Sequence, residues 1–145
     1  MKIHNEFKMN LEAKSVNEAF CRVTVSAFVA PLDPTIEEMT DLKTAVSEAV
    51  TNAIVHGYQN ASGRLYMEGQ LLDGGVVKIK IRDKGVGIQN VNEAMRPLFT
   101  TGGEDRAGLG FTVMQSFCDR VKVTSAPGKG TTVILIKKIA GRTKW

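Results

Sequence analysis

A row of polar side chains interrupts the apolar stretch Glu48-Ala49-Val50-Thr51-Asn52-Ala53-Ile54-Val55-His56-Gly57. Glu48, Asn52 and His56 are four residues apart, which places them on one side of a helix. Thr51 lies beside the row, and most of the remaining residues are apolar. A carboxylate, an amide and an imidazole would then face one cleft, where glutamate could act as a base and asparagine could hold a metal-bound oxygen. The same spacing also fits a helix edge exposed to water, and spacing alone does not separate the two.

Asp83 is a second unusual position. It ends a segment in which every second residue is apolar, so it shares the apolar face of the predicted strand. An inward carboxylate is costly unless another group donates hydrogen bonds to it. Residues 84–88 follow directly, and their glycines, Gly85 and Gly87, allow close approach of a ligand to the backbone. The pattern predicts either a ligand-binding loop or a turn that the aspartate caps.

A glycine-rich loop at residues 100–110 leads into a predicted helix. Free backbone N–H groups and the positive end of a helix dipole favour phosphate at such a place. Arg106 could add a charge-assisted hydrogen bond. The alternative is a flexible surface loop.

Periodicity and capping signals predict the remaining elements. We expect strands over residues 5–13, 64–72, 76–83, 120–125 and 131–138. We expect helices from the capping boxes at Ser15 and Thr35, a short helical piece over 92–95, and a helix over 108–119. The first helix should bury Val16, Ala19, Phe20, Val23, Ala27 and Phe28. The second should bury a stripe that starts at Ile36 and should end near His56, with Gly57 as its C′ residue.

These elements indicate an α+β fold, a two-layer α/β sandwich with a mixed, mostly antiparallel sheet covered on one face by helices. At 145 residues the chain fits a single domain over 1–145, with residues 139–145 as a frayed basic tail. No apolar run approaches the roughly 20 residues that a membrane span needs. No secretory signal is evident, and two cysteines are too few for a disulfide framework or a zinc site, so we expect a cytoplasmic protein.

The net charge of +4 is unevenly distributed, because residues 120–145 carry seven cations and no carboxylate. A basic hairpin can indicate a nucleic-acid binder, whose affinity would depend steeply on salt. No aromatic residue lies among these cations before Trp145, so a platform for stacking bases is not indicated. A solvated strand face is the simpler interpretation.

In chain order, four stretches resemble the sequence motifs of the GHKL ATPase/kinase superfamily, whose fold is of the GHKL/Bergerat type. Residues 48–57 resemble its N box, 83–88 its G1 box, 108–110 its G2 box, and 130–132 its closing motif. Residues 20–25, 32–35 and 97–101 further resemble the sporulation branch of the anti-sigma factor kinases, and this likeness covers nearly the whole chain. Residues 102–105 depart from it, since they read Gly-Gly-Glu-Asp where relatives have a longer segment with a lysine.

The resemblance implies that the chain binds ATP or ADP with Mg²⁺. Asn52 would hold the Mg²⁺, Asp83 would accept the adenine amino group, and Glu48 would orient or deprotonate the attacking serine hydroxyl. The other implied nucleotide-binding residues are Thr51, His56, Gly85, Gly87, Thr100, Thr101, Arg106, Gly108, Leu109, Gly110 and Thr132.

The resemblance also implies partners. The chain would form a homodimer through its first strand, bind a sporulation sigma factor of the sigma F type, with Arg22 as a contact, and phosphorylate a serine on an anti-anti-sigma protein. Neither a membrane nor direct nucleic-acid binding is implied. Two alternatives remain open, namely a related stress-response anti-sigma kinase and a nucleotide-binding module that sequesters a sigma factor without catalysis.

Overall fold

A five-stranded antiparallel sheet forms one layer of the computed structural model, which describes residues 1–96 and 106–140 and, within residues 106–109, the backbone only. Its strands are β1 (Ile3–Glu12), β2 (Arg64–Leu72), β3 (Val76–Asp83), β4 (Arg120–Ser125) and β5 (Thr131–Lys138). Their order is β1-β2-β3-β5-β4, and all four neighbouring pairs are antiparallel. The sheet is thus antiparallel throughout, where the sequence had left a mixed sheet possible.

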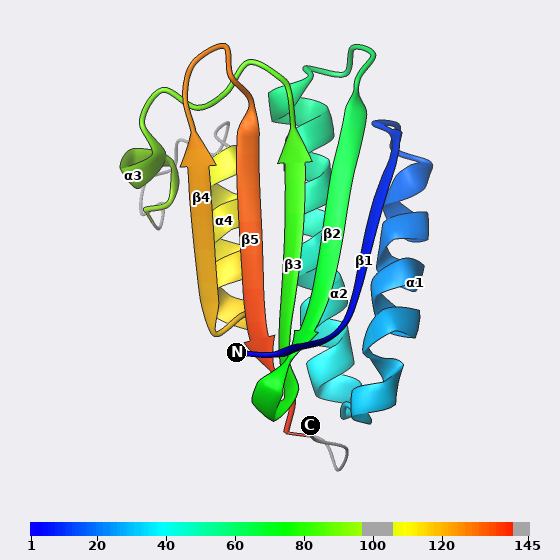
Figure 1. Ribbon diagram of the computed structural model, residues 1–145. Coiled ribbons are helices and arrows are strands. Elements are labelled where there is room, and N and C mark those ends of the chain that lie inside the picture. Colours follow the sequence, from blue (N-terminus) through cyan, green and yellow to red (C-terminus); the bar gives the residue numbers. More distant parts are fainter. Residues whose placement is uncertain (97–105, 141–145) are drawn as a thin grey trace.

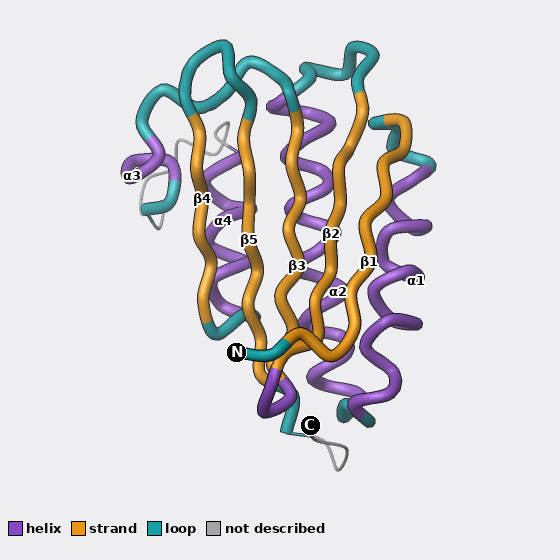
Figure 2. The backbone as a smooth tube through the Cα atoms, in the orientation of Figure 1, coloured by secondary structure: helices purple, strands orange, loops and turns teal. Residues whose placement is uncertain are grey.

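Three helices cover one face of this sheet and leave the other face open (Figures 1 and 2). They are α1 (Asn17–Val29), α2 (Ile36–Thr51) and α4 (Arg106–Phe117). The short helix α3 (Val91–Ala94) lies beside β4. Tight helical turns over Ala30–Leu32 and Asp73–Gly75 join α1 to α2 and β2 to β3. The strands β2 to β5 have the predicted bounds, and β1 starts two residues earlier than predicted.

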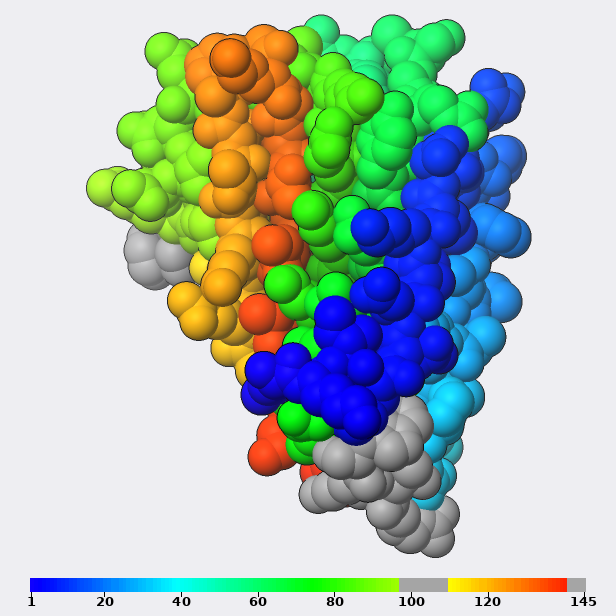
Figure 3. Space-filling view, viewed as in Figure 1, coloured from blue at the N-terminus to red at the C-terminus, as the bar shows by residue number. Residues whose placement is uncertain are grey.

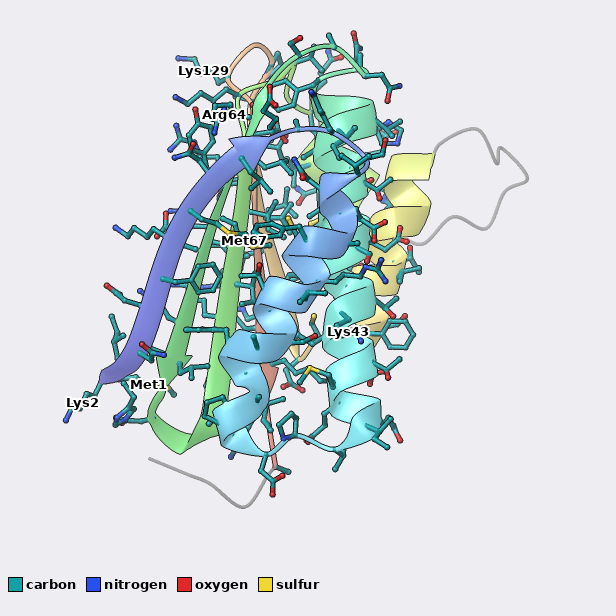
Figure 4. All side chains as sticks on the ribbon, turned by 90° about the vertical axis from the view of Figure 1, so that its right-hand side faces the viewer. Met1, Lys2, Lys43, Arg64, Met67 and Lys129 are labelled. Carbon is teal, nitrogen blue, oxygen red and sulfur yellow. The ribbon has the colours of Figure 1, made fainter. Side chains whose placement is uncertain are left out.

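The core lies between the sheet and the helices. Side chains from α2, such as Leu42 and Val46, and from the inward positions of β3 and β5, such as Ile79 and Leu135, are fully buried there. Met67 of β2 points into the same layer in the side view (Figure 4). The strict alternation of buried and half-exposed residues along β2, β3 and β5 shows that only one face of the sheet is covered.

Helix α1 buries a different face from the one that its periodicity suggested. Its buried residues are Cys21, Val25 and Val29. Three members of the predicted stripe stay exposed: Val16 at 79%, Phe20 at 56% and Val23 at 66%. The predicted capping box at Ser15 does not form either, because the N-cap is Val16 without a side-chain bond and Glu18 instead accepts a hydrogen bond from Ser47 of α2.

Helix α2 begins as predicted, with a complete capping box between Thr35 and Glu38. Ile36, however, is 87% exposed and does not start the buried stripe. The chain end is better anchored than predicted, because Ile139 is buried and its N–H donates to the Gly75 carbonyl, while Ala140 N–H donates to Glu38. Residues 141–145 lie outside the described part. Among the described residues, no helix combines the length and apolar character that crossing a bilayer requires.

Candidate functional site

A cleft of about 420 Å³ opens between the C-terminal half of α2, the sheet and the start of α4. Its walls are mainly apolar, and its polar groups come from Asn52, His56, Asp83 and Thr131. The lining residues are Ala49, Asn52, Ala53, His56, Gly57, Ile81, Asp83, Gly87, Ile88, Phe111, Thr131 and Val133.

Asp83 points into this cleft, as its strand parity predicted, and is only 5% exposed. Its Oδ1 accepts a hydrogen bond of 2.9 Å from Gly85 N–H, and its carboxylate also accepts one from the backbone N–H of Thr131. Burial raises the pKa of this carboxyl above its usual value, and the two hydrogen bonds only partly offset the rise. A buried carboxylate with few donors at the edge of an apolar cleft is suited to accept a further hydrogen bond from a ligand.

Backbone packing around Asp83 explains three glycines. A Cβ on Gly57 would lie 2.8 Å from the Asp83 carboxylate. A Cβ on Gly85 would overlap the Gly57 carbonyl, and one on Gly130, where φ is +77°, would overlap the carbonyl of Asp83. The loop after β3 is therefore wedged between the end of the α2 segment and the β4–β5 hairpin. Hydrogen bonds from Val86 N–H to Gly57 and from Gly128 N–H to Val86 hold it there.

A π-helix over Asn52–Gly57 continues α2 and carries the polar row past the cleft. Such turns are rare and are often found at functional sites. Gly57 is not the left-handed C′ residue that the sequence suggested, since positive φ angles occur instead at Gln59 and Asn60. The glycine at 57 is required by the close approach of Asp83.

Asn52 and Glu48 face the start of α4. A Cβ on Gly110 would lie 3.1 Å from both polar atoms of the Asn52 amide and 3.3 Å from Glu48 Oε1. The Asn52 Nδ2 atom is buried and has no hydrogen-bond partner among the described residues. An unpartnered buried amide is costly for folding alone, so it indicates a ligand that uses the amide. His56 also lines the cleft.

The residues present fit a Mg²⁺ ion that arrives with a phosphorylated ligand. Among the described residues, no cluster of three or more acidic, histidine or cysteine side chains could hold a metal by itself. Mg²⁺ in nucleotide sites needs only one or two protein oxygens, because phosphates and water supply the rest. The Asn52 amide, whose Nδ2 atom has no hydrogen-bond partner in the described part of the chain, can supply one such oxygen after a rotation of the amide.

The other predicted site residues are placed as follows. Thr51 does not line the cleft, and Thr132 lies on the opposite side of β5, paired in register with the outward residue Arg82. The adjacent Thr131, paired with Asp83, occupies the cleft position instead. Gly108 lies within α4. Thr100 and Thr101 lie outside the described residues, and so do the side chains of Arg106 and Leu109.

Arg22 is only partly exposed. Its side chain is 39% exposed, and its Nε lies 2.8 Å from Glu18 Oε1, one helical turn earlier. Because Glu18 also accepts from Ser47, the arginine is held against the α1–α2 contact and does not project freely into solvent.

Sequence reasoning did not identify Phe111, Ser125 or Tyr58. Phe111 forms a buried wall of the cleft directly after Gly110, and its apolar character carried no signal. The Ser125 hydroxyl accepts from Ile88 N–H, donates to the Gly130 carbonyl and lies 2.8 Å from the Thr131 hydroxyl, so it joins the loop to the hairpin. Tyr58 accepts a 2.7 Å bond from Lys84 N–H and donates a 2.6 Å bond to the Arg64 carbonyl.

Replacing Tyr58 by Phe should therefore loosen the loop that follows Asp83. Both backbone groups that lose the hydroxyl are exposed, so water replaces it and the free energy of unfolding should fall by only about 1 kcal/mol. The affinity for ATP that the sequence resemblance implies should fall severalfold, as measured by calorimetry, and thermal unfolding should be measured in parallel. Tyr66→Phe is the matched control, because that ring lies on the open face under Arg82 and Lys84. Unchanged affinity in Tyr58→Phe would show that the phenol does not position the site.

The chain is similar in sequence to a known domain family and to proteins of known name. Residues 10–137 match the family described as histidine kinase-like ATPase domain. An anti-sigma F factor from Geobacillus thermodenitrificans is 53% identical over 139 residues, covering 95% of each chain. One from Bacillus thuringiensis is 52% identical over 140 residues, again covering 95% of each.

Two solved structures share the fold. The structure of the RsbU and RsbW domains of a Mycobacterium tuberculosis protein aligns with a TM-score of 0.68 and 18% identity, covering 97% of this chain and 33% of that one. The histidine kinase domain of a blue-light-activated histidine kinase from Erythrobacter litoralis aligns with a TM-score of 0.56 and 17% identity, covering 87% and 61%. At these identities the likeness concerns the fold alone.

Proposed function

The chain belongs to the anti-sigma F factors, within the histidine kinase-like ATPase domain family, and on that premise we propose that it is an ATP-dependent protein-serine kinase that also binds and inhibits a sigma factor. Its sigma partner is of the sigma F type, and its substrate is a serine on an anti-anti-sigma protein. One observation carries the proposal: Asn52 and Asp83, from two separate sequence motifs, line one cleft, and Glu48 faces Gly110 of α4 together with Asn52. The family match over residues 10–137 also supports a single domain over 1–145.

Nucleotide binding divides between the two ends of the cleft. At the sheet end, Asp83 accepts a hydrogen bond from the adenine amino group, and apolar walls such as Ile81 and Phe111 contact the purine. At the α4 end, Asn52 faces Gly110 in the second turn of α4, and the N-terminal end of a helix favours phosphate. Mg²⁺, held in part by Asn52, supplies charge neutralisation for the phosphates.

Glu48 acts on the protein substrate. It lies one turn before Asn52 on α2 and faces Gly110, so its carboxylate adjoins the phosphate end of the cleft. There it orients the attacking serine hydroxyl and accepts its proton, which is a role worth typically about 10²–10⁴-fold in rate.

The two partners compete through nucleotide state. A ligand shifts a binding equilibrium only if its affinity differs between the alternatives, so ATP and ADP must favour different complexes. The exposed apolar residues Phe20 and Val23 support α1 as a partner-binding surface, and the partly exposed Arg22 lies on another side of the same helix. Because a sigma factor acts on RNA polymerase, we place this competition in the cytoplasm.

The proposal is tested with ATP labelled on its γ-phosphate. The purified chain is incubated with labelled ATP, Mg²⁺ and an extract of the source cells, and the labelled protein is identified by mass spectrometry. We expect one principal labelled protein, phosphorylated on serine, that also releases a sigma factor from the chain. Nucleotide binding without any label transfer would leave only a sequestering module, and failure to bind adenine nucleotides would overturn the whole proposal.

We also propose that the chain is a homodimer through the free edge of β1. That strand is at one end of the sheet, and an unpaired edge readily pairs with another chain. Helix α1, which carries exposed apolar residues, lies beside β1 at this end of the sheet (Figure 1). Sedimentation at micromolar concentration with ATP should give twice the chain mass. A monomer under these conditions would contradict the dimer and leave the kinase proposal intact.

A further inference from the structure

The face of the sheet opposite the cleft carries an unusual apolar strip. On β5, Ile134 and Ile136 turn to this open side and are partly exposed, although the open face of an antiparallel sheet is normally polar. Near one end, Leu72 and Ile3 border a shallow groove that continues the strip from Ile136. Apart from the first residues of the chain, which cross this end, no described element covers the surface (Figures 1 and 3).

Cations flank both isoleucines in register. Ile134 is paired with Lys80 of β3 on one side and with Lys122 of β4 on the other. Ile136 is paired in the same way with Lys78 and Arg120. Neighbouring strands are about 4.8 Å apart, so each apolar side chain lies between two positive charges. We name these six residues the isoleucine–cation face: Lys78, Lys80, Arg120, Lys122, Ile134 and Ile136.

These charges are mostly not neutralised within the described part of the chain. Lys80 has one weak ion pair, 3.7 Å from Glu68. Lys78, Arg120 and Lys122 make no ion pair with a described residue. Cations two residues apart on a strand are about 7 Å from each other, within the screening length of about 8 Å at physiological salt, so they repel. This arrangement adds no stability to the fold, and an acidic partner would reduce the repulsion between the cations.

Three possible occupants of the isoleucine–cation face fit it poorly. A second copy in a symmetric contact would place the same cations against one another. The residues after Ala140 include Arg142 and Lys144 and no acid, so they are repelled as well. Nucleic acid prefers aromatic rings for stacking, and the aromatic side chain described on this face, Tyr66, already has the cations of Arg82 and Lys84 over its ring.

We infer that the isoleucine–cation face docks an acidic amphipathic segment of a partner protein, with apolar side chains on Ile134 and Ile136 and carboxylates on the flanking cations. This interaction goes beyond the proposed function, because the sheet separates this face from the nucleotide cleft. It therefore adds a binding surface that is independent of the β1 edge, α1 and the catalytic groups.

The test uses the full chain and a defined probe, a fluorescent helical peptide with leucines four residues apart and glutamates on both sides of them. We expect salt-sensitive binding that falls at least about tenfold in Lys80→Glu/Lys122→Glu. Lys14→Glu/Lys43→Glu makes the same change in net charge away from the face and should leave the peptide affinity unchanged; Figure 4 shows Lys43 on α2. ATP affinity should stay unchanged in both double variants.

Two further peptides test the apolar and charged parts without altering the protein. Replacing the glutamates by glutamine, or the leucines by serine, should each abolish most of the binding. The inference fails if the glutamate peptide does not bind at millimolar concentration, or if either altered peptide binds as well as the original. It also fails if both double variants lose affinity equally, or if duplex DNA of equal charge binds tighter than the peptide, which would assign the face to nucleic acid.

Discussion

Replacing Glu48 by Gln should lower the rate of phosphate transfer to the protein substrate by about 10²–10⁴-fold and change ATP affinity little. Glutamine keeps the size of the side chain and can still orient a hydroxyl, but it cannot take up the proton that the serine must lose. The rate constant should fall in single-turnover measurements with ATP already bound, which separates the chemical step from nucleotide binding.

The geometry restricts this effect to the transfer step. Glu48 and Asn52 share one face of the α2 segment, and both lie within reach of the Gly110 position at the start of α4. Asp83, by contrast, lies at the sheet end of the cleft, against Gly57. Loss of the Glu48 charge therefore leaves the purine pocket intact.

Glu37→Gln is the matched control, because Glu37 is an exposed acid in the first turn of the same helix. It should transfer phosphate at the wild-type rate. If Glu48→Gln also turned over normally, Glu48 would have no part in the mechanism. If it lost ATP affinity and transfer in equal measure, Glu48 would belong to the binding site instead.

Strands were predictable from this sequence because alternation of apolar and polar residues is a direct consequence of one covered face. The inward position of Asp83 followed from the same parity. Thr131 and Thr132 show the limit of motif reasoning, since the motif singled out Thr132. Applied to β5, parity would have chosen Thr131, which pairs with Asp83.

Helix α1 was not predictable in the same way. It has apolar residues on two faces, and periodicity cannot decide which of them meets the core. The structure buries Cys21 and Val25 and leaves Phe20 and Val23 exposed. The apparent capping box at Ser15 failed for a tertiary reason, because Glu18 bonds to Ser47 and Arg22 instead.

The parts of the site that depend on long-range packing were also not predictable from the sequence. Nothing local in the sequence indicates that Gly57 must be small to admit Asp83, or that Tyr58 and Ser125 hold the loop after β3. These contacts join residues that are distant along the chain, so only the assembled fold reveals them.

Asp83→Asn should weaken ATP binding by about 10- to 100-fold, the expected effect of losing one buried hydrogen bond to a charged acceptor. In the variant, the single amide oxygen is needed by Gly85 N–H, which now bonds to Oδ1. The remaining NH₂ group then meets the adenine amino group, donor against donor. GTP presents a carbonyl at that position, so its affinity should fall less than that of ATP or even rise.

Stability measurements distinguish this binding effect from a folding defect. The pKa of Asp83 is raised by burial, so the folded state holds the proton more tightly than the unfolded chain. The contribution of the carboxyl therefore favours folding below its usual pKa and is lost as the pH rises through the raised value. Asparagine does not titrate, so the free energy of unfolding of Asp83→Asn, relative to wild type, should increase from about pH 3 to about pH 7. A variant that lost ATP affinity only because it unfolded would instead have a free energy of unfolding near zero at the pH of the binding assay. One that stayed folded, followed this trend and kept ATP affinity would remove Asp83 from adenine recognition.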